Sequence, residues 1–480
     1  MLRVPLILLA VLTASRVWFG LTVPPNMDEA YYFGWGEHLQ LSYIDHAPMV
    51  GWLSGAARAL FGSTLFSAHI MPFLSFGLVV LALFIHFGGR DRANWPLLLW
   101  ALVIWLATPV FHALSILTYP DHALIGFSAL ALVFFARFVE AEPRAARGDL
   151  YLGALFLGLA GLSKYSAVLL GLGLLITLVS SKRLRSQFAD PHLYLAAALS
   201  LCLMSPVLIW NVMNGFPTLN LHGVERFESH DRGFALAGLV RLFAQSLIYL
   251  SPLGLGLGLW AVARGAKASA TGRLMLSVTI VGMLPFVLLS LWVPAAEQVA
   301  PHWLTIGFLP LMLALPGALG RGWRRGLHLG YGLVVIAVLN LYYVTAPALT
   351  LALGLSDREA VVTFGQDQLA RAARDAAATT GATLFAVPTY QEASKLAFQL
   401  GSSRDVVTLD PRMDQYDFWQ RPDAIGEDAI IIVQPGNGEK FIAPAFQSTE
   451  PLGEITTTRG GQTLAVFRLI LGHGFKGVAR

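Results

Sequence analysis

The sequence predicts a polytopic α-helical membrane protein that ends in a small soluble α/β domain. Of its 480 residues, 55% are hydrophobic and only 13% are charged, and the mean hydropathy is +0.61. Long apolar runs recur over residues 1–350, and the composition changes to that of a soluble domain after about Gly354. These three observations exclude an ordinary soluble protein. Cys202 is the single cysteine, so the chain cannot form an intrachain disulfide.

About eleven apolar segments are predicted to cross the membrane. They cover residues 4–22, 67–87, 96–112, 119–139, 150–163, 165–180, 192–210, 236–262, 274–293, 303–319 and 328–348. The first of them resembles a signal peptide. No small-x-small cleavage site precedes Pro24, however, so we interpret it as the first membrane helix.

Basic residues between the spans give the orientation. They form five clusters, Arg90 and Arg92, Arg144 and Arg147, Lys182 to Arg185, Arg264 to Arg273, and Arg321 to Arg325, and all five fall on one side of the membrane. The positive-inside rule assigns that side to the cytoplasm. We therefore expect the first loop, residues 23–66, to face outward, together with residues 211–234, 293–302 and the chain after about Thr350.

The assignment of basic loops to the cytoplasm also predicts a turn at Lys164. The stretch from Asp149 to Ser180 is apolar except around Lys164, yet basic residues flank it on both sides. A single crossing is incompatible with two cytoplasmic flanks, so the chain must go out and back near Ser163, Lys164 and Tyr165. An ionisable residue at that depth is a functional candidate. The alternative is a lysine that snorkels to the interface.

The first outer loop contains the densest group of polar and aromatic residues, between Asn26 and Pro48. Asn26 can cap a helix, and Glu29 three positions later completes a capping box. Asp28 and Glu29 then lie in the first helical turn, where the helix dipole favours carboxylates. The alternative is that this acidic pair only begins a capped helix.

The soluble domain, residues 351–480, alternates helical and strand-like patterns. Helices are predicted over residues 356–378 and 390–400, and strands over residues 383–387, 406–409, 429–433 and 464–469. This alternation is typical of a small α/β domain.

Polar residues from four outward-facing places form a candidate site. The first loop contributes Asp28, Glu29, Glu37, His38, Asp45 and His46, and the turn contributes Lys164. The segment 211–234 contributes Asn211, His222 and Arg226, and the segment 293–302 contributes Glu297, Gln298 and His302. Cations beside carboxylates at a membrane face suit a lipid-phosphate substrate, because the cations offset the phosphate charge and a carboxylate can deprotonate a hydroxyl. The sequence has no phosphate-binding or dinucleotide glycine motif, so a soluble nucleotide donor is unsupported.

Two parts of this candidate site have other interpretations. His38 and His46 are weak candidates for a divalent metal, because their spacing matches no strong ligand pattern. His302 with Trp303 is also typical of an interfacial aromatic anchor.

The chain resembles a known family in several motifs. They are Asp28-Glu-Ala-Tyr-Tyr32, Asp45-His-Ala-Pro48 with Trp52-Leu53, Gly161-Leu-Ser-Lys-Tyr165, Trp210-Asn211, Glu297 to Trp303, Tyr390 to Phe398 and Asp414 to Trp419. Together they resemble the GT-C glycosyltransferases of the family 39 type, which are relatives of the protein O-mannosyltransferases. The chain is also similar to the bacterial lipid A aminoarabinose and galacturonic acid transferases of this family. The likeness covers nearly the whole chain.

The resemblance implies an inverting glycosyltransferase that moves one sugar from a polyprenyl-phosphate donor to an acceptor on the periplasmic face of the bacterial inner membrane. Lipid A, lipopolysaccharide or another envelope glycan is favoured as acceptor over protein. The catalytic role would fall on Asp28 and Glu29, with Asp28 as the base for a hydroxyl acceptor. For a phosphate acceptor the two acids would instead orient substrates or hold a cation. The leaving phosphate would be bound by Lys164 and Arg226.

The remaining candidates for substrate binding are Tyr31, Tyr32, Asp45, His46, Asn211, His222, Glu297 and His302. One motif departs from the family pattern, because Ala47 stands where relatives commonly have a first proline after the Asp-His pair. No cofactor is certain, although a divalent cation is compatible with the acidic loop.

Two other functions compete with this hypothesis. A flippase for lipid-linked glycans should show paired repeats and polar residues at several membrane depths, whereas the polar groups here gather at one face. A non-catalytic assembly protein would leave Asp28 and Lys164 without a role. The acceptor is not carried over from the family, because the soluble domain and the acceptor loops vary most between its branches.

Overall fold

The computed structural model describes residues 2–221, 234, 236–292, 299–353, 355 and 357–478, and these form two compact units. The helical unit comprises Met1–Phe19, Leu41–Met49 and Pro72–Val338. The mixed unit comprises Gly20–Gln40, Val50–Met71 and Leu339–Arg480. The division into domains at residue 350 stays a prediction, since each unit combines segments from distant parts of the sequence.

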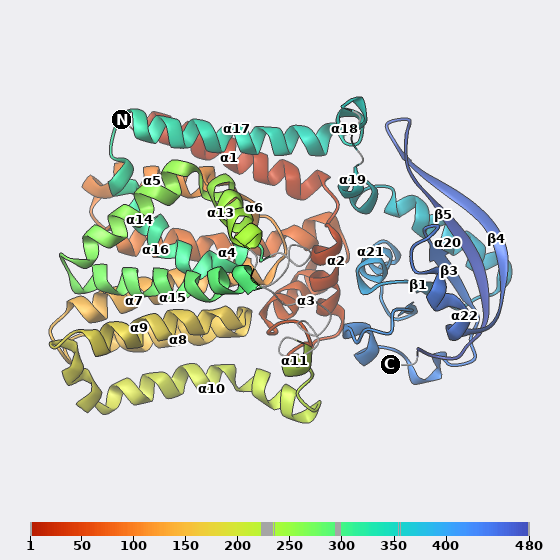
Figure 1. Cartoon of the computed structure of the whole chain (residues 1–480), viewed down its shortest axis with the longest axis horizontal. Helices are drawn as coiled ribbons and strands as arrows, with labels where there is room; N and C mark the ends of the chain where they lie inside the picture. The colour runs from red at the N-terminus through yellow and green to blue at the C-terminus, as the bar shows by residue number, and fades with distance from the viewer. Residues whose placement is uncertain are drawn as a thin grey trace. The chain divides into compact units, whose positions relative to one another are not determined.

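The helical unit is a bundle of apolar helices (Figure 1). Its helices are α1 (Arg3–Thr22), α4 (Leu65–His86), α5 (Trp95–Ala107), α6 (Pro109–Leu114), α7 (Pro120–Glu140), α8 (Arg147–Ser163), α9 (Val168–Ser180), α10 (Pro191–Met213), α11 (Pro217–Asn220), α13 (Leu236–Leu250), α14 (Pro252–Ala266), α15 (Ala270–Trp292), α16 (Thr305–Leu319) and α17 (Trp323–Thr345). The first and last residues of α1, α4 and α17 belong to different units.

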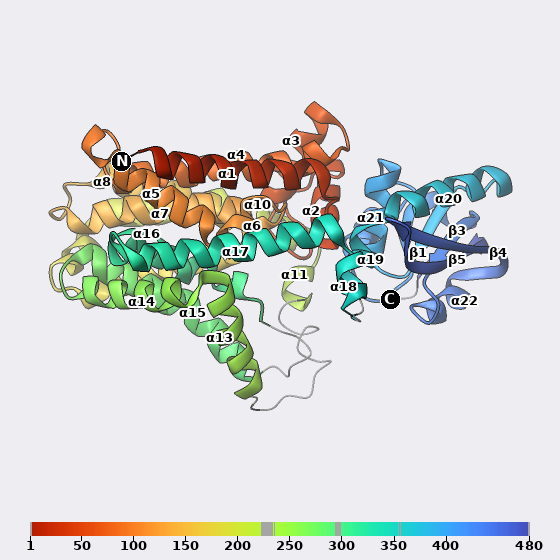
Figure 2. The same cartoon turned by 90° about the horizontal axis from the view of Figure 1, so that it is seen from above.

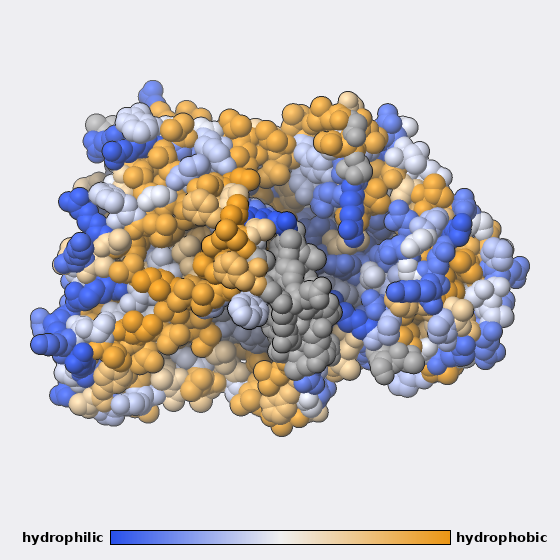
Figure 3. All heavy atoms as spheres, in the orientation of Figure 1, coloured by the Kyte–Doolittle hydropathy of each residue, from blue (hydrophilic) through white to orange (hydrophobic). Residues whose placement is uncertain are grey.

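Apolar side chains make up much of the face of the bundle that Figure 3 shows, as expected of a surface that contacts lipid. Leu201 is 69% exposed and Leu288 is 55% exposed, whereas α7 lies inside the bundle with most of its residues buried. Arg16 is buried within the first helix, where its guanidinium donates to the carbonyl oxygen of Ser115 at 2.8 Å and lies over the ring of Phe73. The predicted multi-pass membrane fold is therefore confirmed.

The predicted number of eleven spans is not confirmed. Among the described residues, seven helices are long and apolar enough to cross a membrane, or eight if α13 and α14 form one bent span. The segment predicted as one helix over residues 236–262 is broken at Ser251, whose φ is +67°, and α13 and α14 meet there at 95°. Pro252 favours this break, because proline disfavours the helical conformation of the residue that precedes it, here Ser251. Figure 2 shows α13 running obliquely to α14.

Close helix packing in the bundle depends on small residues. A Cβ added to Gly282 of α15 would lie 2.4 Å from the backbone nitrogen of Gly307 in α16, so the two backbones touch there. Small residues allow this approach in membranes, where van der Waals packing replaces the hydrophobic effect between helices.

The mixed unit contains a five-stranded sheet with strand order β2-β1-β3-β5-β4. The strands are β1 (Leu384–Val387), β2 (Val406–Thr408), β3 (Ala429–Val433), β4 (Phe446–Arg459) and β5 (Gln462–Phe475). The strand β1 pairs in parallel with β2 and β3, whereas β5 pairs antiparallel with β3 and β4. The helices are α2 (Met27–Gly34), α3 (Met49–Phe61), α18 (Ala348–Ala352), α19 (Arg358–Thr363), α20 (Gln366–Thr380), α21 (Tyr390–Leu400) and α22 (Ile442–Ala445).

One prediction for this unit was wrong, and one strand was missed. The helix expected over residues 356–378 is divided into α19 and α20, because Gly365 adopts a left-handed conformation with φ +75°. The strand β4 was not predicted, because it is an edge strand whose residues are mostly exposed and polar. It also contains Pro451, which a central strand excludes.

Candidate functional site

The helix α2 begins with the capping box that the sequence predicts. The Asn26 side chain accepts a hydrogen bond from the backbone nitrogen of Glu29 at 3.0 Å, and Glu29 Oε2 accepts one from the backbone nitrogen of Asn26 at 3.1 Å. Glu29 is only 1% exposed, and its Oε1 lies 3.4 Å from Nε2 of His69, which is equally buried. The Glu29 carboxylate is therefore held inside the protein by its own helix and by His69.

Asp28 has a different environment from that of Glu29. It lies in the first turn of α2, is half-buried, and its Oδ1 accepts a hydrogen bond of 3.4 Å from Nε2 of Gln391 in α21. Of the two carboxylates in this turn, Asp28 is thus the one with access to a ligand.

The two helices α2 and α21 pack through aromatic residues. The ring centroids of Tyr31 and Tyr390 lie 4.6 Å apart, and those of Phe33 and Phe398 lie 5.6 Å apart. Tyr31 is 3% exposed and belongs to the core, whereas Tyr32 is half-buried with its ring 5.1 Å from that of Trp35. Of the two tyrosines predicted to bind substrate, Tyr32 is the more accessible.

Lys395 of α21 anchors the chain just before α2. Its ammonium group donates to the carbonyl oxygens of Pro25 at 2.6 Å and Thr363 at 3.2 Å, and the side chain is buried. Burial lowers the pKa of Lys395 to about 8, and the charges of Glu29 and Glu359 oppose that shift. The sequence motif around Lys395 was recognised, but this role was not predicted, because the contact joins residues far apart in the sequence.

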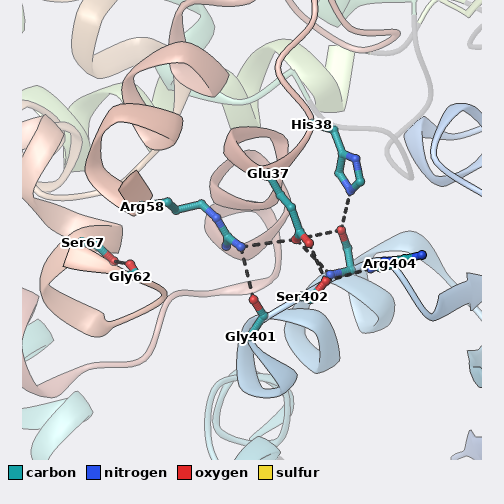
Figure 4. A network of polar contacts seen from close by, with 9 residues as sticks. Glu37, His38, Arg58, Gly62, Ser67, Gly401, Ser402 and Arg404 are labelled. Atoms are coloured by element: carbon teal, nitrogen blue, oxygen red, sulfur yellow. Dashed lines mark hydrogen bonds and ion pairs between the residues drawn. The ribbon is translucent and has the colours of Figure 1, made fainter. Parts of the chain in front are cut away.

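Glu37 lies at the centre of a polar network in the mixed unit (Figure 4). Its carboxylate accepts hydrogen bonds from the hydroxyl group of Ser402, from the backbone nitrogen of Ser403 at 2.9 Å and from the hydroxyl group of Ser403 at 3.0 Å, and it pairs with Arg58 at 3.3 Å. Burial would raise the pKa of Glu37. The hydrogen bonds from Ser402 and Ser403 and the charge of Arg58 outweigh that effect and hold the pKa below its usual value.

His38 completes the network. Its Nε2 lies 2.8 Å from the hydroxyl oxygen of Ser403, and its ring stacks on that of Trp419 with centroids 4.5 Å apart. Burial lowers the pKa of His38, and the charge of Arg58 acts in the same direction while that of Glu37 opposes it. Glu37 and His38 thus connect the first loop to the turn after α21.

The helical unit contains the predicted turn with Lys164 at its tip. The helix α8 ends at Ser163, Lys164 is extended, and a 3-10 helix follows over Tyr165–Ala167. Lys164 is 9% exposed, and its ammonium group donates to both oxygens of Asp121 at 3.0 and 2.9 Å. The helix α7 begins at Pro120, so Asp121 reaches Lys164 from a neighbouring helix start.

Asp121 was not among the predicted site residues. The sequence held a signal for it, because Asp121 is a carboxylate within a predicted apolar span. The ion pair explains how a charged residue is accommodated there, since breaking such a buried pair leaves an uncompensated charge. Any anion that binds the ammonium group of Lys164 would compete with Asp121 for its hydrogen bonds.

Other predicted residues of the helical unit have varied positions. His302 lies beside the Tyr119 ring, with centroids 6.3 Å apart, and interacts electrostatically with Asp121 and Lys164. Asp45 interacts electrostatically with Tyr165 and is half-buried, as is His46.

Asn211 is buried and donates to the carbonyl oxygen of Val207 in its own helix at 3.0 Å. Its side chain therefore supports α10 locally.

Three predicted site residues, His222, Arg226 and Glu297, lie outside the described residues, as does Gln298. Within the part of the chain that the structure describes, no three His, Cys, Asp or Glu side chains are grouped so as to hold a metal ion. His38, one of the two weak metal candidates, instead hydrogen-bonds Ser403 and stacks on the ring of Trp419.

Residues 45–210 match the dolichyl-phosphate-mannose-protein mannosyltransferase family. A lipid A galacturonosyltransferase, RgtD of Rhizobium johnstonii, is 25% identical over 317 residues, which cover 65% of this chain and 64% of that protein. The chain thus matches somewhat less than two thirds of the length of this relative.

Two crystal structures of ArnT from Cupriavidus metallidurans share the fold. The apo structure has a TM-score of 0.63 at 18% sequence identity, and the structure bound to undecaprenyl phosphate has a TM-score of 0.63 at 17% identity. In both comparisons the likeness covers 97% of this chain and 97% of ArnT. The helical bundle and the C-terminal sheet are therefore parts of one known architecture.

Proposed function

We propose that the chain is a GT-C glycosyltransferase that transfers a single sugar from a polyprenyl-phosphate donor to lipid A or another envelope glycan. The observation that carries the proposal is the buried Lys164, held by Asp121 where the apolar helix α8 ends. Ionisable residues within membrane segments are rare, and they commonly mark the sites where substrates or ions bind. The relative that acts on lipid A supports the choice of acceptor.

Lys164 is assigned to the donor phosphate. A phosphate that approaches the ammonium group gains a charge-assisted hydrogen bond, and Asp121 keeps Lys164 oriented when the site is empty. His302, which interacts electrostatically with both groups, is assigned to the same phosphate-binding region. Arg226 remains proposed as the second cation on the basis of its sequence position.

Asp28 is assigned as the general base, and Glu29 as a positioning residue for α2. In the reaction, the acceptor hydroxyl oxygen forms a bond to the anomeric carbon on the face opposite the phosphate. The bond between that carbon and the phosphate oxygen breaks, and Asp28 takes the hydroxyl proton. Lys164 stabilises the negative charge that develops on the leaving phosphate. A phosphate acceptor needs no such base, and Asp28 would then orient it.

We further place the reaction on the periplasmic face of the bacterial inner membrane. The start of α7, the end of α8 and the start of α16 meet around Lys164. At the other ends of these helices, Arg183 donates to the carbonyl oxygen of Ala141 at 2.9 Å, and Arg147 pairs with Asp190 at 3.0 Å. These basic residues favour the cytoplasmic side for that end of the bundle.

The proposal is tested by mass spectrometry of the envelope lipids of cells with and without the protein. Cells that carry Asp28→Asn or Lys164→Met should lose the same single sugar mass as the deletion strain. Asp367→Asn removes an exposed carboxylate that pairs with Arg371 on the surface of α20, and it should leave the lipids unchanged. A deletion that alters no lipid, or an Asp28→Asn strain that matches the wild type, would refute the proposal in favour of transport or assembly.

A further inference from the structure

The mixed unit contains a pocket of about 640 Å³ beside the candidate catalytic helix. Its size falls within the range of about 300–1,000 Å³ that is usual for small-ligand sites. It is lined by Met27, Pro347, Leu351, Asp357, Arg358, Val361, Val362, Thr389, Gln391, Glu392, Gln434, Asn437, Thr463 and Leu464. These residues come from α2, from the segment around α18 and α19, from α21, from the loop after β3 and from β5.

The polar groups of the pocket are mostly neutral amides and hydroxyls. Gln391, Gln434 and Asn437 supply amides, and Thr389 and Thr463 supply hydroxyls. Each amide both donates and accepts hydrogen bonds, which matches the hydroxyl groups of a sugar. Apolar side chains, among them Met27 and Val362, complete the wall and suit the C–H faces of sugar rings.

The charges in the pocket do not favour a phosphate. Among the described lining residues, Arg358 is the only cation, and two carboxylates lie in the same wall. Asp357 accepts hydrogen bonds from Tyr342 and Thr350 at 2.6 Å each, and these hold its pKa low although burial would raise it. Glu392 accepts from the hydroxyl group of Thr389 at 3.1 Å, and burial raises its pKa. Asp357 thus stays ionised and repels an anion.

The pocket is connected to the candidate base by two residues. Met27 directly precedes Asp28, and Gln391 donates to Asp28 Oδ1 at 3.4 Å. A ligand in the pocket that displaced or shared the Gln391 amide would therefore have a hydroxyl group within reach of Asp28. The capping box between Thr389 and Glu392 fixes the start of α21 and hence the place of Gln391.

We propose that this pocket binds the saccharide part of the acceptor and presents one of its hydroxyl groups to Asp28. The inference rests on the proposed glycosyl transfer and adds the location of the acceptor site. It also gives the C-terminal residues a part in catalysis, because α21 and the loop after β3 contribute all three amide side chains that line the pocket. The sugar of the donor has the same hydroxyl chemistry, and the experiment must separate the two sources.

The test is equilibrium binding of the dephosphorylated and fully deacylated disaccharide of lipid A, as a saccharide probe, to the full-length protein in detergent micelles. Thr463→Trp places a large ring in the pocket from an exposed position of β5 and should weaken binding more than tenfold. Gln434→Ala removes one hydrogen-bonding group and should weaken binding by about 2- to 10-fold. Gln447→Ala removes an exposed amide of β4 that does not line the pocket, and should bind like the wild type.

Each outcome decides the proposal. Absence of saturable binding to the wild type, or binding that Thr463→Trp leaves intact, overturns it. Displacement of the probe by a polyprenyl-phosphate hexose assigns the pocket to the donor sugar and overturns the acceptor assignment. Because binding is measured without turnover, a failure of the transferase proposal is recognised separately, from lipids that do not change in the Asp28→Asn strain.

Discussion

Replacing Glu37 by Gln tests the network that ties the first loop to the turn after α21. The Glu37 carboxylate accepts hydrogen bonds from Ser402 and Ser403 and pairs with Arg58. Hydrogen bonds to a charged group contribute about 1.5–3 kcal/mol and neutral ones about 0.5–1.5 kcal/mol, so the amide loses about 1 kcal/mol at each of the three partners. Glu37 is 22% exposed, and screening by water reduces the total to about 2 kcal/mol.

The assay is hydrogen exchange of the full-length protein, read at the backbone amide of Ser403. This amide donates to Glu37 Oε2 at 2.9 Å, so its protection reports directly on the network. A loss of about 2 kcal/mol corresponds to exchange that is about 30-fold faster.

Glu439→Gln is the matched control, because Glu439 pairs with Arg468 at an exposed site and should not affect Ser403. Unchanged exchange at Ser403 in Glu37→Gln would refute the reasoning, since it would mean that the charge of Glu37 contributes nothing to the closed network.

Three further predictions concern stability. Lys395→Ala should lower the free energy of unfolding by about 3–5 kcal/mol, because it leaves buried carbonyl groups without a donor and removes one of the positive charges near Glu29. The exposed Lys440→Ala should change the melting temperature little. Acidification should loosen the network in two steps. Because folding lowers the pKa of His38, the unfolded chain binds the proton first as the pH falls below about 6.5, and the free energy of unfolding decreases. Because folding also lowers the pKa of Glu37, the stabilisation by its carboxylate is lost as the pH falls from about 4.5 through that lowered pKa. His38→Gln should abolish the first step in hydrogen exchange at Ser403, and an unaltered pH profile would contradict this assignment. Asn26→Ala should cost about 1 kcal/mol and Asn26→Ser much less in thermal unfolding, because serine retains the cap of α2, and equal losses would argue against the cap.

Local sequence patterns were sufficient for much of the fold. Apolar length and the alternation of basic loops predicted a multi-pass membrane protein, and they placed the turn at Lys164 correctly, because the hydrocarbon layer limits where charges and backbone groups lie. The capping box of α2 was predicted because Asn26 and Glu29 interact within one helical turn.

Features that depend on backbone breaks were predicted less well. The bend at Ser251 and the division between α19 and α20 at Gly365 occur where apolar or helical periodicity continues in the sequence. The edge strand β4 carries little hydrophobic pattern, because most of its side chains face solvent, and its pairing with β5 is a tertiary event.

Sequence patterns alone were enough to predict the class of membrane protein, the acidic first turn of α2 and the turn at Lys164. The environments of the charged residues became known only from the folded structure. It buried Glu29 against His69, left Asp28 beside Gln391, and paired Lys164 with Asp121. Those distinctions depend on contacts between residues remote in sequence, whose energies come from burial and charge pairing that no local pattern records.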